Sequence, residues 1–428
     1  MENRYIKVGE KEFGPVSLLE LRELVKQGAF SNEDLVWNAA TDSWVAAGSV
    51  AELNELFKNQ NGNSTKSKIY AIASGKGGVG KTITTCSLGV ALASMGSDVI
   101  LVDADLGGPD LHTCMGILEP KFSFFDFYTL QCDSLNDIVI KTPIENLGII
   151  SGACGTLGLA NPRYFQKQRI IREFKNLQAQ YVILDLGAGS SYNVIDFFLL
   201  ADEKILIVSP EPTAVHEAFG FIKICLLRML HQQLKGHPSA LEILSQEEVN
   251  RPGRIQFTVA DLLFQIESTD PAAVPIFKSV LDTFRPKLIV NLVKDREEIK
   301  EGQAIQAAAR ELLSIQVDYL GYISYDEKVS AAVKGLKPFL VHDPKSQAAQ
   351  DLAALIRVKL LGKKGFKEIL ERRKWKKNVK QVAREYPDAD LLKGAPICSV
   401  NCFYWGDCEY QDGGQPCRVR HLEPAFKD

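Results

Sequence analysis

The sequence predicts an α/β fold, in which a doubly wound, mostly parallel sheet carries helices on both faces. Seven short apolar segments recur between residues 68 and 323, with helical patterns between them. Parallel strands that are buried on both faces are continuously apolar rather than alternating. A glycine-rich sequence at 74–82 follows the first segment and precedes a helical pattern from Ile83 to Ala93. These observations predict one α/β domain over residues 68–361.

The seven apolar segments are the expected strands of this sheet. They cover residues 68–73, 98–103, 147–151, 181–185, 204–208, 287–293 and 318–323. Each is short and bounded by turn or helix residues, which favours strands over buried helices. The interval 215–285 is long for a single crossover, so we expect a helical insertion there.

The glycine-rich sequence carries the first chemical signal. Gly75, Gly80, Lys81 and Thr82 match the P-loop pattern G-x-x-x-x-G-K-[ST]. Such a loop directs backbone N–H groups and the positive end of the following helix at phosphate oxygens. We expect Lys81 to reach the terminal phosphates of a nucleoside triphosphate and the Thr82 hydroxyl to ligate Mg²⁺.

A dinucleotide fingerprint is the competing interpretation of these glycines. With Gly77 they also satisfy G-x-G-x-x-G, and Asp103 follows about 20 residues beyond the last glycine. A pyrophosphate turn needs no lysine–hydroxyl pair, however. The Lys81-Thr82 pair therefore favours the triphosphate.

Two of the predicted strands end in acidic residues. One runs into Asp103-Ala104-Asp105, and another ends at Asp185, which is followed by Leu-Gly-Ala-Gly. Ligands of open parallel sheets bind beyond the carboxyl ends of the strands, so these acids should lie beside the P-loop. Asp185 would hold Mg²⁺ through water, and Asp105 would orient the attacking water. The two glycines after Asp185 would let the γ-phosphate approach closely.

Five motifs in this order resemble the MinD/ParA family of ATPases, and the last two are most similar to its FlhG-like branch. The motifs are Lys76-Gly77-Gly78-Val79-Gly80-Lys81-Thr82, Asp103-Ala104-Asp105, Asp185-Leu186-Gly187-Ala188-Gly189, Ser209-Pro210-Glu211-Pro212-Thr213 and Val290-Asn291-Leu292-Val293. The first has the additional lysine of the deviant Walker A motif. The resemblance covers residues 68–345 and implies ATP and Mg²⁺ as ligands.

The resemblance also implies roles for individual residues. Lys76 would reach the γ-phosphate of the partner subunit in an ATP-bound homodimer. Asn291 would recognise adenine, and Pro210 and Glu211 would line the base pocket. The implied catalytic residues are Lys76, Lys81 and Asp105. The implied nucleotide-binding residues are Gly75, Lys76, Gly77, Gly78, Val79, Gly80, Lys81, Thr82, Ile83, Asp185, Pro210, Glu211 and Asn291.

This chain departs from the family pattern in two places. After Asp105 it reads Leu-Gly-Gly-Pro-Asp-Leu-His, where an asparagine often follows in MinD-like proteins, so the role of Asp110 stays open. The 215–285 segment is also longer than in MinD, which leaves its partner-binding surface open.

A small α+β domain is expected at residues 1–57, before a polar linker at 58–67. Its pattern of Tyr5, Phe13-Gly14-Pro15, Trp37 and Trp44 resembles a bacterial GYF-type domain. Such domains bind proline-rich peptides in an aromatic groove. The alternative is that Trp37 and Trp44 are core aromatics of a small domain.

The segment after the predicted sheet is strongly basic. Residues 357–384 contain twelve Lys or Arg and two Glu, and a basic helical segment is expected at 362–388. A basic amphipathic helix here would suit contact with a membrane surface or with DNA. The alternative is a solvated helix that packs on the ATPase domain.

Residues 389–428 form a cysteine-rich tail. Cys398, Cys402, Cys408 and Cys417, with His421, could provide the four ligands of a zinc ion, and a metal would supply the folding energy of so short a segment. An iron–sulfur cluster and a metal-free tail remain alternatives.

Composition narrows the functional classes. The net charge of −3 gives no overall attraction to nucleic acid or membrane. Residues 1–4 lack signal-peptide character, and no apolar run approaches the roughly 18 residues of a membrane span. We therefore expect a cytoplasmic protein, with peripheral contact at the inner face of the membrane as an option.

The leading functional prediction is an ATP-dependent dimeric switch that positions a cellular assembly, of the cell-division, flagellar or chromosome type. The alternatives are an Mrp-like iron–sulfur cluster carrier and an adaptor scaffold with weak ATPase activity.

Overall fold

The chain divides into two units, Met1–Tyr386 and Pro387–Asp428. The computed structural model describes residues 4–8, 11–26, 30–38, 41–50, 52–53, 67–129, 131–152, 164–250, 258–362, 375–384 and 386. The predicted linker, except Ser67, and the whole cysteine-rich tail with Cys398, Cys402, Cys408, Cys417 and His421 lie outside the described residues. Their predicted metal site stays a prediction.

The centre of the first unit is an eight-stranded sheet with the order β12-β11-β10-β5-β9-β6-β8-β7. All neighbouring strands are parallel except β7 and β8. The strands are β5 (Lys68–Ser74), β6 (Val99–Ala104), β7 (Ile140–Lys141), β8 (Leu147–Ile150), β9 (Tyr181–Ala188), β10 (Glu203–Val208), β11 (Lys287–Val293) and β12 (Asp318–Ser324). The predicted doubly wound α/β fold is confirmed. The two-residue edge strand β7 was not predicted, because so short a segment has no apolar pattern.

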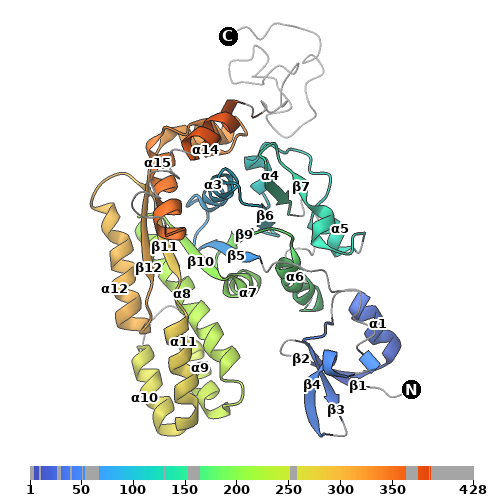
Figure 1. The fold of residues 1–428 in the computed structure, drawn as a ribbon. Helices are drawn as coiled ribbons and strands as arrows, with labels where there is room; N and C mark the ends of the chain where they lie inside the picture. The colour runs from blue at the N-terminus through green and yellow to red at the C-terminus, as the bar shows by residue number, and fades with distance from the viewer. Residues whose placement is uncertain are drawn as a thin grey trace, which may run out of the picture. The chain divides into compact units, whose positions relative to one another are not determined.

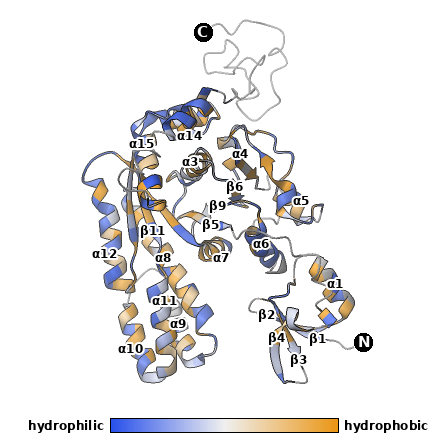
Figure 2. Cartoon of the chain, in the orientation of Figure 1, coloured by the Kyte–Doolittle hydropathy of each residue, from blue (hydrophilic) through white to orange (hydrophobic). Residues whose placement is uncertain are grey.

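Helices cover both faces of this sheet. Figure 1 shows α3 and α15 on one face and α7 and α8 on the other. The helices are α3 (Lys81–Ala93), α4 (Leu111–Cys114), α5 (Phe124–Tyr128), α6 (Tyr164–Asn176), α7 (Tyr192–Leu200), α8 (Pro212–Gln233), α9 (Pro238–Asn250), α10 (Val259–Thr269), α11 (Val274–Thr283), α12 (Glu301–Leu313), α13 (Glu327–Lys334), α14 (Phe339–His342) and α15 (Gln347–Ala354). Figure 2 shows α6 largely in blue, in keeping with its polar sequence.

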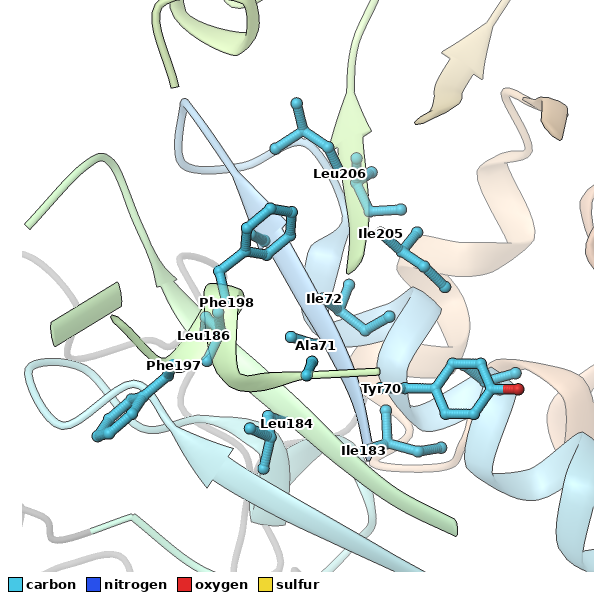
Figure 3. Close-up of a cluster of buried hydrophobic side chains, with 14 of the residues drawn as sticks. Tyr70, Ala71, Ile72, Ile183, Leu184, Leu186, Phe197, Phe198, Ile205 and Leu206 are labelled. Carbon is cyan, nitrogen blue, oxygen red and sulfur yellow. The ribbon is translucent and has the colours of Figure 1, made fainter. Parts of the chain in front are cut away.

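The central strands are buried on both faces. In β5 every residue after Lys68 is buried, and its apolar side chains meet those of β9 and β10 (Figure 3). Phe198 of α7 is fully buried, and its ring packs edge-on against Phe221 of α8 with the centroids 5.0 Å apart. Burial on both faces explains why these strands are continuously apolar in the sequence.

The predicted insertion at 215–285 contains the extra helices. After α8 the chain forms α9, α10 and α11, which pack on one another and on α8 (Figure 1). Thr258 begins α10 with a capping box: its hydroxyl accepts a hydrogen bond from the Asp261 N–H, and the Asp261 carboxylate accepts one from the Thr258 N–H. Phe264 of α10 is 71% exposed, whereas Leu262 and Ile266 are buried.

The N-terminal domain is a separate antiparallel sheet with the order β2-β1-β3-β4. Its elements are β1 (Arg4–Val8), β2 (Lys11–Val16), α1 (Leu18–Lys26), β3 (Leu35–Asn38) and β4 (Ser43–Ala46). Trp37 and Trp44 face each other across β3 and β4, with ring centroids 5.4 Å apart. Both rings are only partly buried and lie outside the buried cluster around Ile6 and Phe30. The alternative that they are core residues is therefore not favoured, and peptide binding stays a prediction.

The end of the basic segment packs on the α/β domain. The chain continues from α15 as a π-helix over Leu355–Leu360, and residues 375–384 form a further helix. Trp375 is 3% exposed and Val379 is fully buried against the main core. Because Trp375 is buried, it is not exposed to a membrane here. Within the described part of the chain, no helix is both long and apolar enough to cross a bilayer.

The aromatic contact between α7 and α8 gives a stability prediction. Phe198→Ala is expected to lower the free energy of unfolding by about 3–5 kcal/mol, because it leaves a cavity under the sheet. Phe264→Ala, the same change at a largely exposed ring, should alter it by about 0.5 kcal/mol or less. Urea unfolding followed by circular dichroism measures both, and equal effects would contradict the packing described.

Candidate functional site

The P-loop connects the end of β5 to the start of α3, and its glycines are required by its surroundings. Gly78 and Gly80 have positive φ angles of 79° and 86°, which side-chain-bearing residues rarely adopt. A Cβ on Gly75 would lie 2.5 Å from the backbone of Glu217 in α8. The loop is therefore held close to α8, and Gly77 and Gly78 remain exposed.

Lys81 and Asp185 form a buried ion pair at the centre of the site. Lys81 Nζ lies 3.0 Å from Asp185 Oδ1, and the two side chains are 9% and 0% exposed. The Thr85 hydroxyl donates to the same oxygen at 2.9 Å. Burial raises the pKa of Asp185 above its ordinary value, and the Lys81 charge opposes that rise. Asp185 Oδ2 is also buried, and it has no hydrogen-bond partner among the described residues.

A second buried carboxylate lies next to Asp185. The parallel register of β6 and β9 pairs Asp103 with Asp185. Asp103 is fully buried and accepts hydrogen bonds from the N–H groups of Leu111 at 3.0 Å and Asp105 at 3.3 Å. Burial, and next the charge of Asp185, raise the pKa of Asp103 well above its ordinary value. The sequence placed Asp103 at a strand end but did not indicate this coupling.

Asp105 lies beside the glycines that follow Asp185. Its Oδ1 accepts hydrogen bonds from the N–H groups of Gly107 at 3.2 Å and Gly108 at 3.1 Å. A Cβ on Gly187 would lie 3.2 Å from the same oxygen. The structure thus brings Asp105, just after β6, close to Gly187 near the end of β9.

Thr82 contacts an acid whose role the sequence left open. Its hydroxyl donates to Asp110 Oδ1 at 3.2 Å. Thr82, Asp110 and the unpartnered oxygen of Asp185 are hard oxygen ligands of the kind that Mg²⁺ binds. The described residues contain no group of three or more His, Cys, Asp or Glu that could hold a metal alone. A Mg²⁺ ion at this site would therefore need phosphate and water oxygens as well, as Mg²⁺ usually does.

Lys76 is bound at a different place from Lys81. Its Nζ lies 3.1 Å from Glu211 Oε2 and 2.9 Å from the Thr213 hydroxyl. Lys76 and Glu211 are 37% and 64% exposed. Glu211 and Pro210 lie between β10 and α8, at the same edge of the sheet as the P-loop. The two lysines of the loop therefore differ: one is buried, and the other is half exposed.

Asn291 has a contact that the sequence did not indicate. Its side-chain amide donates to the Val79 carbonyl at 2.8 Å, and the residue is 8% exposed. A Cβ on Gly80 would lie 2.2 Å from that amide nitrogen. The next residue, Leu292, has a φ angle of 64°, and the pairing of β11 with β12 is irregular there. Asn291 thus supports the P-loop, and its predicted contact with adenine remains a prediction.

Two further predicted nucleotide-binding residues lie at the start of α3 and in the loop before it. Ile83 is in the first turn of α3 and is half buried, and Val79 is buried. The roles assigned to the site residues stay predictions. The sequence missed the contact of Asp110 with Thr82.

Two family models match the chain. Residues 5–53 match GYF domain 2, and residues 70–339 match the CobQ/CobB/MinD/ParA nucleotide binding domain. These matches confirm the resemblance stated from the motifs.

Several curated proteins are similar to the chain. It is 32% identical over 167 residues to the antiactivator FleN of Pseudomonas aeruginosa. The matched region covers 39% of this chain and 59% of FleN. It is 28% identical over 266 residues to the septum site-determining protein MinD of Synechocystis. This matched region covers 60% of this chain and 93% of that protein. The putative MinD of Chlorella vulgaris is 31% identical over 38% of this chain and 59% of its own length. The match thus spans less than two thirds of FleN and of the Chlorella protein.

Among solved structures, MinD from Pyrococcus horikoshii in complex with Mg-ADP is similar to the chain. Its identity is 21% and its TM-score 0.46, over 69% of this chain and 97% of that one. The MinC:MinD complex of Aquifex aeolicus has an identity of 19% and a TM-score of 0.46, over 70% of this chain and 98% of that one. The nucleotide-binding family model, which matches residues 70–339, covers more than half of the sequence, and the chain therefore belongs to the CobQ/CobB/MinD/ParA family.

Proposed function

We propose that this protein is an ATP-hydrolysing molecular switch that dimerises in its ATP-bound state. The observation that carries the proposal is the different placement of two lysines in one phosphate-binding loop. Lys81 is buried on Asp185, where a bound phosphate would lie beside it. Lys76 is half exposed and held by Glu211 and Thr213, so it is accessible from outside the subunit.

In the buried pair, Lys81 can exchange its anionic partner, the Asp185 carboxylate, for a phosphate. Lys81 would leave Asp185 for the terminal phosphate oxygens, which offer it a stronger charge-assisted contact. Asp185 would then have both carboxylate oxygens directed at the site, and Thr82 and Asp110 would complete the protein ligands of Mg²⁺. Bound Mg²⁺ would neutralise charge that develops on the phosphate oxygens.

The hydrolytic step would depend on Asp105. Its position beside Gly187 supports this role, because the γ-phosphate is expected to approach these glycines and the attacking water would lie in line with it. Asp105 would accept a hydrogen bond from this water and hold it in position. Its present contacts with the N–H groups of Gly107 and Gly108 fix the loop that carries it.

Dimerisation would use Lys76 in the partner's site. The pair of Lys76 with Glu211 is exposed, and exposed ion pairs contribute about 0.2–1 kcal/mol. Lys76 can therefore leave Glu211 at little cost when a more strongly charged phosphate is present. Similarity to septum site-determining proteins supports a role of the switch in positioning a cellular assembly.

Lys81→Ala is expected to abolish ATP binding, or to weaken it at least about 100-fold, because the phosphates lose a buried cation. Isothermal titration calorimetry with ATP and Mg²⁺ measures the affinity. Lys278→Ala, at an exposed lysine of α11, is the control and should bind as the wild type does. Unchanged affinity in the Lys81 variant would overturn the nucleotide site.

Lys76→Ala is expected to bind ATP with less than about a tenfold loss of affinity but to remain monomeric, because its contact lies across the subunit interface. Light scattering with ATP and Mg²⁺ gives the oligomeric state, and the wild type should form a dimer under the same conditions. A Lys76 variant that dimerises like the wild type would exclude the role of this lysine in the partner's site.

Asp105→Asn is expected to bind ATP normally and to hydrolyse it at least about 100-fold more slowly. Asparagine keeps an oxygen that can accept the hydrogen bonds from the Gly107 and Gly108 N–H groups. The change therefore removes the negative charge and preserves the contacts that hold the loop. Phosphate release under saturating ATP measures the rate. Full activity in this variant would contradict the assigned role, and a wild type as slow as the variant would favour the scaffold alternative.

A further inference from the structure

A cavity of about 360 Å³ lies apart from the P-loop, where the C-terminal end of the ATPase domain folds back. Three segments form its walls: the loop after α14, the α15 helix with its π-helical continuation, and the helix at 375–384. Lys345, Gln350 and Arg357 come from the first two segments, and Trp375, Lys376 and Lys380 come from the third. A cavity of this size is in the range of sites for small molecules, roughly 300–1,000 Å³.

The charged side chains that line this cavity are all cationic among the described residues. Its lining contains four cationic side chains, Lys345, Arg357, Lys376 and Lys380, and no carboxylate among the described residues. The acids of the neighbouring α14–α15 region have other contacts. Asp343 is paired with Lys328 at 2.7 Å, and Asp351 accepts a hydrogen bond from the Ser324 hydroxyl at 2.6 Å. The positive potential of the cavity is therefore not neutralised by these two carboxylates.

Arg357 makes the cavity a built site rather than a group of surface lysines. It is 5% exposed, and its guanidinium carbon lies 5.4 Å from the centre of the Trp375 ring. The Gln350 amide donates to the Lys345 carbonyl at 2.9 Å, so the loop that carries Lys345 is tied to α15.

We propose that this cavity binds a small organic phosphate of about mononucleotide size. A phosphate monoester carries nearly two negative charges at neutral pH and offers three acceptor oxygens. Arginine and lysine donors bind such groups through charge-assisted hydrogen bonds. The apolar side chains between the four cations would contact the organic part of the ligand. The site is separate from the P-loop and does not depend on the proposed ATPase function.

The test uses equilibrium dialysis of the full-length protein with labelled AMP as the probe. Lys376→Glu combined with Lys380→Glu reverses two exposed lining charges and should weaken AMP binding at least about 100-fold. The matched control is Lys377→Glu combined with Arg384→Glu, which makes the same change of net charge on the same helix at exposed residues outside the lining. The control should bind AMP as the wild type does.

Two further variants keep the result independent of folding and of the P-loop. Lys380→Met removes a single charge without reversing it and should weaken AMP binding about tenfold. Lys81→Ala should leave AMP binding at this cavity unchanged. AMP binding that Lys81→Ala abolishes would belong to the P-loop and would overturn the proposal, as would equal losses in the lining and control pairs.

Sedimentation with phosphatidylglycerol vesicles distinguishes a soluble phosphate from a lipid surface. The proposal expects AMP to bind with dependence on Lys376 and Lys380. Protein that fails to bind AMP but binds these vesicles through the same two lysines would replace the proposed ligand with a membrane surface. Absence of binding to both probes would also overturn it.

Discussion

The buried contact between Lys81 and Asp185 joins the first residue of α3 to the central strand β9, and the rest of the site is arranged around it. Burying both charges is costly, and breaking such a pair leaves one charge uncompensated in the interior. The pair therefore persists only while each partner has a suitable counter-charge. Triphosphate oxygens are such a counter-charge for the lysine, and a divalent cation is one for the carboxylate. In the proposed function, this contact holds both side chains in place until ATP and Mg²⁺ replace it.

A second buried carboxyl, that of Asp103, lies beside Asp185 and affects the charge of the site. Asp103 stands beside Asp185 in the sheet, with a pKa raised well above its ordinary value by burial and by that neighbour. An acid with a raised pKa in the folded state holds its proton there at a pH where the unfolded chain has lost it. Its contribution to the free energy of unfolding therefore falls as the pH rises above the unfolded pKa. The raised pKa of Asp103 therefore reduces the negative charge that this carboxyl adds beside Asp185 at a given pH.

Much of the fold followed from the sequence, because seven buried strands are continuously apolar and the phosphate loop has its own pattern. β9 runs three residues beyond its predicted end, to Ala188, so that Gly187 lies within the strand and Gly189, with a φ of 82°, follows it. What the sequence could not indicate are contacts between residues far apart in the chain. The Asn291 amide holds the Val79 carbonyl across a separation of 212 residues. Asp110 reaches Thr82 only because the segment after β6 folds back over the start of α3.

The helix at 375–384, together with Tyr386 just after it, has hydrogen bonds to two parts of the nucleotide domain. Asn378 donates to the Ser94 carbonyl, just beyond the end of α3, at 2.6 Å, and Tyr386 donates to the Met115 carbonyl, just beyond α4, at 2.7 Å. One of these anchors follows the P-loop helix, and the other follows the segment that carries Asp105 and Asp110. A shift of either segment relative to the other must strain or release one of the two bonds. The segment at 375–386 thus ties the end of the P-loop helix to the segment that carries Asp105 and Asp110.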